Sequence, residues 1–171
     1  MKTDFLLIQK VKSGKIEASE HFVKKYYSSI YRYCFLHIHN CDCAEDMTQE
    51  TFLRFFESLD RYHDYGKTKS YLYCIAGNIV KNYYKKKKEM LMDEIPDLFE
   101  NSMDDIAGTL DIEQAVDNLP DELKEITILF FFQELRQREI AELLNIKLSL
   151  VKYRISRAKK ILSVCFEECE R

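Results

Sequence analysis

The chain has 171 residues, a formal net charge of −3 and 46% hydrophobic residues, but only four glycines and two prolines. So little glycine and proline disfavours turn-rich all-β folds and favours long helices, and we expect an all-α protein. No stretch approaches the roughly 18 uninterrupted apolar residues that span a bilayer, and residues 1–14 lack a signal peptide's apolar block, so we expect a soluble, cytoplasmic protein without membrane insertion.

Two helices rich in aromatic residues are predicted first. A short helix is expected over roughly 4–13, with Gly14 as its stop, and a longer one over roughly 19–39, with Ser19 as its N-cap. Large apolar side chains recur near helical spacing in the longer helix, at Phe22, Tyr26, Ile30, Tyr33 and Leu36. This pattern indicates a packed core rather than a cofactor site.

Six cysteines are present, and we expect free thiols because disulfides are typical of small secreted chains. His37, His39, Cys41 and Cys43 suggest a metal site at first sight. However, alternate residues fall on different sides of a helix, and no second pair has zinc-ribbon spacing. We therefore predict no metal and no cofactor.

Residues 44–88 form two helical patterns joined by an aromatic, charged loop. Asp42 and Glu45 resemble a capping box at the start of the first helix. That helix has one apolar face (Phe52, Phe55, Phe56, Leu59) and a separate polar face (Asp46, Gln49, Glu50, Leu53). From Lys67 to Lys88 there are seven lysines and no acidic residue. A solvated polar surface with a lysine fringe is the simpler interpretation.

Charge is segregated along the rest of the chain. Residues 89–122 contain 12 acidic residues and no Lys or Arg, whereas residues 136–160 contain 8 basic and 2 acidic residues. We predict a first domain over 1–92, an acidic linker over 93–110 and a second domain over 111–171. Such a pattern suits two modules that face nucleic acid, separated by a segment that repels phosphate.

The second domain has a helix-turn-helix pattern, in a winged-helix-like arrangement of three to four helices. Pro120 is placed at the first turn of a helix over 121–132, and Asn145 at a turn that requires a left-handed residue. On the following helix, from about 148 to 168, Ser149, Lys152, Tyr153 and Ser156 share an outward face opposite the apolar Val151, Ile155 and Ala158. This helix suits the DNA major groove, although a merely solvated charged helix is the alternative.

The chain resembles bacterial RNA polymerase sigma factors of the extracytoplasmic-function (ECF) group. The motifs of the first domain are AEDMTQETF (44–52), LDRY (59–62) and YLYCIAGN (71–78). Those of the second are Leu119-Pro120, EIAE (139–142) and the spacing Val151-Lys152, Arg154, Arg157-Ala158. Two independent motif sets in the right order make the resemblance specific.

The resemblance implies partners and roles for these faces. The partners would be core RNA polymerase, through its β′ clamp helices and β subunit, promoter DNA and, as in many relatives, an anti-sigma factor. The clamp helices would bind Asp46, Gln49, Glu50 and Leu53. The first domain would recognise and melt the minus-ten element with Arg61, Tyr62, His63, Tyr65, Lys67, Lys69, Tyr71, Asn78, Lys81 and Lys85. The second would read the minus-thirty-five element with Arg138, Ser149, Lys152, Tyr153, Arg154, Ser156, Arg157 and Lys160.

The chain also departs from the family pattern. Cys74 and Gly77 occupy positions where relatives often have arginine, Tyr71 replaces a tryptophan, and Lys147 replaces a hydroxyl residue before the recognition helix. Base preference therefore cannot be copied from relatives, and Gly77 costs a helix about 1 kcal/mol relative to alanine.

We predict a sigma factor that directs promoter-specific initiation, and not an enzyme, because no nucleophile–base pair, phosphate loop or paired carboxylates suggest an active site. One alternative is a stand-alone helix-turn-helix regulator whose first domain binds a partner. Another is that the first domain is purely an interaction bundle.

Overall fold

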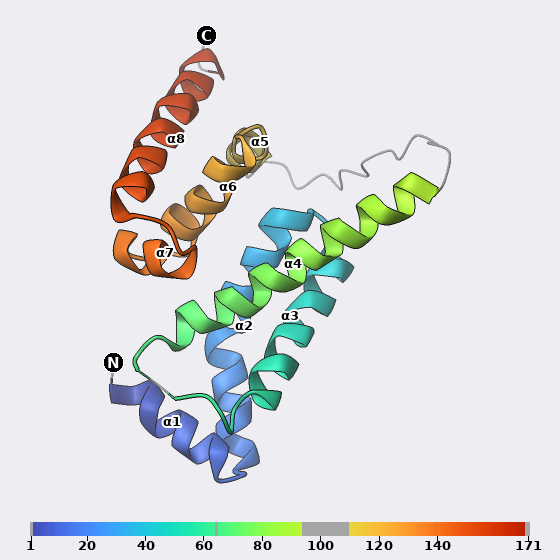
Figure 1. The fold of residues 1–171 in the computed structure, drawn as a ribbon, viewed down its shortest axis with the longest axis vertical. Helices are drawn as coiled ribbons and strands as arrows, with labels where there is room; N and C mark the ends of the chain where they lie inside the picture. Colours follow the sequence, from blue (N-terminus) through green and yellow to red (C-terminus); the bar gives the residue numbers. More distant parts are fainter. Residues whose placement is uncertain (1, 64, 94–109, 170–171) are drawn as a thin grey trace. The chain divides into compact units, whose positions relative to one another are not determined.

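The structure is a computed structural model that describes residues 2–63, 65–93 and 110–169 (Figure 1). The described residues contain helices and no strand, which confirms the all-α prediction. They form two compact units, Met1–Glu100 and Asn101–Arg171. The predicted acidic linker, 93–110, lies outside the described residues apart from its two ends.

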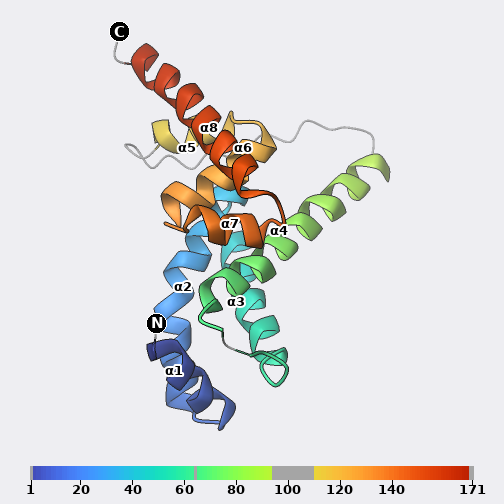
Figure 2. The ribbon, with the colours of Figure 1, turned by 60° about the vertical axis from the view of Figure 1, so that its left-hand side comes forward.

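The first unit has four helices, α1 (Lys2–Lys12), α2 (Ile16–Ile38), α3 (Cys41–Glu57) and α4 (Thr68–Asp93). The last three pack against one another, and α1 packs on α2 (Figure 1 and Figure 2). The predicted aromatic core is observed, with Phe22 stacked on Phe55 at a ring-centroid distance of 4.7 Å. Fully buried side chains from all three packed helices complete it, including Ile30, Tyr33 and Leu72.

The starts of α2 and α3 differ from the predicted ones. Ser19 lies inside α2, because the chain already turns at Gly14 (φ 77°) and the Lys15 carbonyl accepts from the Ala18 and Ser19 amides. Asp42 lies in the first turn of α3 and is not its cap. The N-cap is Asn40, whose side-chain oxygen accepts a hydrogen bond from the Cys43 amide at 2.8 Å. Both predicted caps are therefore wrong.

Gly77 allows α4 to approach α2 closely. A Cβ atom at this position would lie 3.0 Å from the hydroxyl oxygen of Tyr33, which is 1% exposed and packs on the Tyr73 ring. A longer side chain at Gly77 would therefore displace Tyr33. The glycine at this position is thus a packing feature of this chain.

Gly77→Ala should leave the free energy of unfolding nearly unchanged, because the helix-propensity gain of up to about 1 kcal/mol is offset by crowding against Tyr33. In a Tyr33→Phe background the hydroxyl is gone, so the same substitution should stabilise the chain by about 0.5–1 kcal/mol. Urea unfolding of the four proteins of this cycle, followed by circular dichroism, measures the coupling. Equal effects in both backgrounds would contradict the packing explanation.

Cys34 is a fully buried free thiol in the core of the first unit, beside Thr48. Burial raises the pKa of Cys34 from 9.0 to about 11, although the hydrogen bond with Thr48 opposes the shift. The folded state therefore favours the protonated thiol. This contribution to stability is fully present below pH 9.0 and is lost as the pH rises toward about 11.

A thiol reagent applied at about pH 8 should therefore modify the exposed Cys41 and Cys74 rapidly and Cys34 only when the chain unfolds. Peptide mass spectrometry with and without denaturant measures the three rates. Modification of Cys34 in the native protein at the rate of Cys74 would show that the thiol is accessible.

The second unit comprises α5 (Leu110–Asp117), α6 (Asp121–Thr127), a π-helical turn η1 (Ile128–Phe132), α7 (Gln137–Leu143) and α8 (Leu148–Cys169). α8 packs on both α6 and α7 (Figure 2). The predicted helix over 121–132 is present, but its last five residues form the π-turn, closed by the Gln133 amide donating to the Ile128 carbonyl. The described part of this unit contains no strand and hence no wing.

The predicted helix-turn-helix is confirmed in α7, the turn at Asn145 and α8. Asn145 has the expected left-handed backbone, with a φ of 52°. Ile140 of α7 and Val151 of α8 are fully buried between the two helices, as their spacing predicted. Glu139 caps α7 by accepting a hydrogen bond from the Arg136 amide at 2.7 Å. Across all described residues, no helix is long and apolar enough to cross a membrane.

Candidate polymerase and nucleic-acid interfaces

α3 presents a polar stripe with one apolar residue in it. Asp46 and Gln49 are exposed, and Leu53 is 55% exposed. Glu50 accepts a hydrogen bond from the Arg54 side chain at 2.6 Å, one turn further on. The charge of Glu50 is thus partly balanced, whereas Asp46 forms no ion pair within the described part of the chain.

The inward side of α3 explains why this stripe faces outward. Thr48 and Thr51 are fully buried, and each hydroxyl donates to a main-chain carbonyl of its own helix at 2.7 Å. Phe52 and Phe55 pack on the Phe22 ring of α2. Because that side packs in the core, the stripe of Asp46, Gln49, Glu50 and Leu53 lies on the outer side of the helix. The structure brings these four predicted residues together on one surface.

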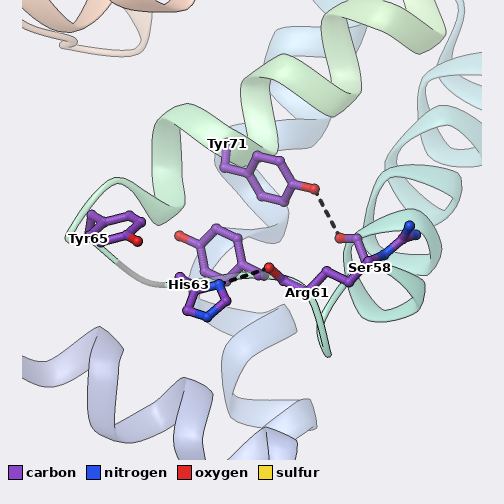
Figure 3. Close-up of a pocket in the computed structure, with 6 residues that line it drawn as sticks. Ser58, Arg61, His63, Tyr65 and Tyr71 are labelled. Atoms are coloured by element: carbon purple, nitrogen blue, oxygen red, sulfur yellow. Dashed lines mark hydrogen bonds between the residues drawn. The ribbon is translucent and has the colours of Figure 1, made fainter.

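The loop between α3 and α4 is anchored by a pair of tyrosines. The Tyr62 and Tyr71 rings stack with centroids 4.9 Å apart and an interplanar angle of 21°. The Tyr71 hydroxyl donates to the Ser58 hydroxyl at 3.1 Å, as Figure 3 shows, and the Tyr62 hydroxyl donates to the Thr68 hydroxyl at 3.3 Å. Both rings also contact Phe55, with centroid distances of 5.5 and 6.1 Å. The tyrosine pair therefore joins the loop to the core.

A pocket of about 320 Å³ lies against this tyrosine pair. Its remaining walls are Ser58, Arg61, His63 and Tyr65 (Figure 3). Tyr65 is 81% exposed and its ring lies 6.4 Å from the His63 ring, at an interplanar angle of 23°. The volume is at the lower end of the range of about 300–1,000 Å³ for small-ligand sites, and aromatic surfaces line two sides of the pocket.

A polar strip runs along α4 from this pocket. Tyr71, Cys74, Asn78, Lys81 and Lys85 recur at helical spacing on one face. All of them except the half-buried Tyr71 are exposed. Cys74, where the family resemblance leads us to expect an arginine, thus lies in the strip. Exposed thiols give no positive charge, so Lys81 and Lys85 supply the cations of this strip, and Lys85 also pairs with Glu89 at 3.8 Å.

The other two predicted lysines lie at the start of α4. Lys67 is exposed in the loop. Lys69 is half-buried, with its Nζ 5.9 Å from the centre of the Tyr73 ring. The Lys69 ammonium is thus held over a core tyrosine, beside the pocket rather than in its wall.

In the second unit, α8 has the outward face that its sequence predicted. Tyr153 is 60% exposed. Its exposed neighbours on this surface are Ser149, Lys152, Ser156, Arg157 and Lys160. Arg138 is exposed on α7, the first helix of the motif. These side chains are accessible to a DNA groove. On the opposite side of α8, Val151, Ile155 and Ala158 are buried in the core of the second unit.

Arg154 differs from the other residues predicted to read the minus-thirty-five element. Its guanidinium pairs with the Glu122 carboxylate of α6, and the Arg154 side chain is 21% exposed. Arg154 therefore points toward the body of the second unit and not with Tyr153 and Ser156. An ion pair between residues 32 positions apart has no periodic signature, which explains why the sequence did not reveal it.

Sequence reasoning also missed Ser58, which lines the pocket and fixes Tyr71, and Lys12 of α1, which reaches the same loop. The Lys12 ammonium donates to the Tyr62 carbonyl at 2.7 Å. Neither residue belongs to a motif. Lys12 contacts the loop from α1 and Ser58 contacts α4 from the end of α3, and such contacts are visible only in the structure.

Comparison with known proteins identifies the family. The family model for Sigma-70 region 2 matches residues 22–89, and the model for Sigma-70, region 4 matches residues 109–162. ECF RNA polymerase sigma factor SigW of Bacillus subtilis is 30% identical over 174 residues, covering 91% of this chain and 92% of SigW. SigM of the same organism is 29% identical over 154 residues, covering 86% of this chain and 94% of SigM.

Solved structures share the fold at lower sequence identity. The sigma factor RpoE of Bartonella quintana, in complex with the anti-sigma factor NepR, gives a TM-score of 0.73 at 18% identity, covering 86% of this chain and 96% of RpoE. CnrH, in complex with the cytosolic domain of CnrY, gives a TM-score of 0.74 at 18% identity, covering 95% of this chain and 96% of CnrH. From the two family matches and the similarity to SigW along nearly the whole length of both chains, we conclude that the chain belongs to the ECF group of RNA polymerase sigma factors.

Proposed function

We propose that this chain binds core RNA polymerase and directs it to promoters whose two elements are read by the two units. Residues 1–92 would bind polymerase and open the minus-ten element, and residues 111–171 would read the minus-thirty-five element. The observation that carries the proposal is the aromatic pocket of the first unit, which continues into the exposed strip of Asn78, Lys81 and Lys85 on α4. A pocket that can hold a base, next to cations that attract the phosphate backbone, suits a single DNA strand.

The pocket suits an unstacked base. Stacking on an aromatic side chain is worth about 1–3 kcal/mol per base, and this free energy is gained only when the strands are separated. Tyr65 and His63 are the exposed rings that a base can reach, while Tyr62 and Tyr71 form the inner wall. Arg61, Lys67, Lys69, Lys81 and Lys85 would attract phosphates, which adds affinity but little sequence preference. Binding here would thus favour the open strand.

In the second unit, the exposed face of α8 would lie in the major groove. Lys152, Tyr153 and Arg157 would contact base edges, because their side chains are long enough to reach the groove floor. Ser149 and Ser156 add short hydrogen-bonding groups. Arg138 and Lys160 lie at the periphery of this face and would contact phosphates.

The proposed role needs no active site in this chain and places the protein in the cytoplasm with core polymerase. On this proposal the chain is a specificity subunit and not an enzyme. RpoE, which shares this fold, was solved with the anti-sigma factor NepR. We therefore include an anti-sigma factor among the proposed partners, with the α3 stripe as the surface for which it would compete.

Transcription with purified components tests the proposal. Sequencing of transcripts after overexpression first identifies a promoter. The chain with core polymerase should then give run-off transcription from that promoter, whereas the chain alone should bind the duplex weakly. Tight, specific binding without polymerase, together with no stimulation of transcription, would favour a stand-alone helix-turn-helix regulator.

Arg154→Glu should destabilise the second unit, because it places two carboxylates together at Glu122. Since Glu122 is well exposed, we expect a loss of up to about 1 kcal/mol, which lowers the melting temperature by a few degrees. Adding Glu122→Arg should restore most of the lost stability. Thermal unfolding of the single and double variants, followed by circular dichroism, measures the rescue.

The exposed Arg157 provides the matched control for this charge reversal. Arg157→Glu should weaken promoter binding with little effect on the melting temperature, and Glu122→Arg should not rescue it. If Arg154→Gln instead weakened promoter binding without affecting stability, Arg154 would contact DNA as the family resemblance implied.

A further inference from the structure

Lys12 lies outside both stretches that match the sigma-factor family models. It is the last residue of α1, and its ammonium donates to the main-chain carbonyl of Tyr62, 50 positions away, at 2.7 Å. α1 is itself held on the first unit, since Ile8 and Val11 are buried and Asp4 pairs with Lys25 of α2. Lys12 therefore connects a fixed helix to the loop that forms the pocket.

Tyr62 is the residue through which this connection acts. Its ring stacks on Tyr71, its hydroxyl donates to Thr68 and its carbonyl accepts from Lys12. The first two contacts fix the Tyr62 side chain. The third fixes the Tyr62 main chain, at the end of the turn that follows α3. A hydrogen bond from a charged donor is stronger than one between neutral groups. Without it, the backbone leading to His63 and Tyr65 would be held by fewer contacts.

We propose that Lys12 is a positioning residue for the single-strand pocket: it holds the Tyr62 carbonyl and so fixes the loop that presents His63 and Tyr65. This inference rests on the proposed function of the pocket and extends it to α1. The competing explanation is that the Lys12 ammonium attracts a DNA phosphate directly. A phosphate contact would weaken as salt rises, whereas a contact within the protein stabilises the loop even without DNA.

Hydrogen exchange of the full chain without DNA or polymerase tests the contact itself. The amide of Tyr62 is a direct probe because it donates to the Ser58 carbonyl at 3.0 Å. Lys12→Met retains most of the side-chain length without the charge, and amides 59–63 should then exchange about tenfold faster, which corresponds to about 1.4 kcal/mol. Lys10→Met removes the same charge from an exposed position of α1 and should leave these amides unchanged. Equal exchange in Lys12→Met and the unaltered chain would overturn the proposal.

Promoter opening by the holoenzyme tests the consequence. Fluorescence of 2-aminopurine in the minus-ten element reports strand separation. Lys12→Met should lower the opening equilibrium about five- to tenfold at both low and high salt, while Lys12→Arg, which keeps a charged donor, should stay near the unaltered chain. If Lys12→Met and Lys10→Met reduced opening equally, and only at low salt, direct attraction of phosphate would replace the positioning role.

Tyr65→Ala separates failure of this inference from failure of the proposed function. If Tyr65→Ala reduces opening but Lys12→Met does not, the pocket functions without help from α1 and only the inference is wrong. If Tyr65→Ala leaves opening unchanged, the pocket does not bind the strand, and the positioning role fails with it.

Discussion

Asp46→Arg should abolish co-purification of the chain with core RNA polymerase. Asp46 is exposed on the α3 stripe and forms no ion pair within the described residues, so its negative charge is available to a basic partner surface. Bringing like charges together in an interface costs several kcal/mol, and each 1.4 kcal/mol lowers the affinity about tenfold. Asp46→Asn removes the attraction without adding repulsion and should give an intermediate loss.

Glu20→Arg is the matched control, since it makes the same charge change at an exposed position of another helix, α2. It should co-purify with polymerase like the unaltered chain. Circular dichroism should show the same helix content in all three variants, because neither position contributes to the core. Full retention of polymerase by Asp46→Arg would mean that the stripe is a solvated surface, the simpler interpretation of its sequence.

Leu53 gives a second reason to expect a partner on this stripe. An apolar side chain that is 55% exposed between polar neighbours gains free energy when a partner covers it. On the proposed function, the exposed Asp46 would select a basic partner and Leu53 would add an apolar contact.

Periodicity predicted the faces of the helices well because burial follows helical spacing directly. Phe22, Phe55 and Val151 are buried as expected, and Asn145 adopts the left-handed backbone that its place in the turn required. The helix starts were less predictable. Ser19 and Asp42 have suitable side chains, but the caps are set by where Gly14 and His39 turn the chain, and several residues nearby could serve equally well.

Contacts between distant segments could not be predicted from the sequence. Gly77 lowers the helix propensity of α4, but the Tyr33 hydroxyl of α2 leaves no room for a larger side chain there. Tyr62 belongs to the predicted strand-reading loop, yet its ring and hydroxyl are engaged within the protein. Arg154 has the spacing of its exposed neighbours but pairs with Glu122. In each case the deciding partner lies on another element, and the binding roles of the individual residues stay predictions.

Replacing Lys152 and Tyr153 together by alanine should change which minus-thirty-five sequences the holoenzyme prefers. Both side chains are exposed on the outward face of α8, where a base contact is worth about 1–3 kcal/mol of discrimination. Preference at the contacted positions should therefore fall by about five- to 150-fold, while co-purification with polymerase is unchanged. Selection of promoters from a randomised library, with and without the substitutions, measures the change.

Lys159→Ala distinguishes base reading from general attraction to DNA. Lys159 is on the same helix, but its Nζ lies 5.6 Å from the Phe131 ring of η1, so the ammonium is directed away from the reading face. Its loss should weaken binding to all sequences alike, as expected for a charge that contributes only attraction to phosphate. If replacing Lys152 and Tyr153 by alanine also weakened binding to all sequences alike, the face that reads bases would lie elsewhere on the second unit. A change in preference confined to the pair would instead show that α8 reads the promoter through these two side chains.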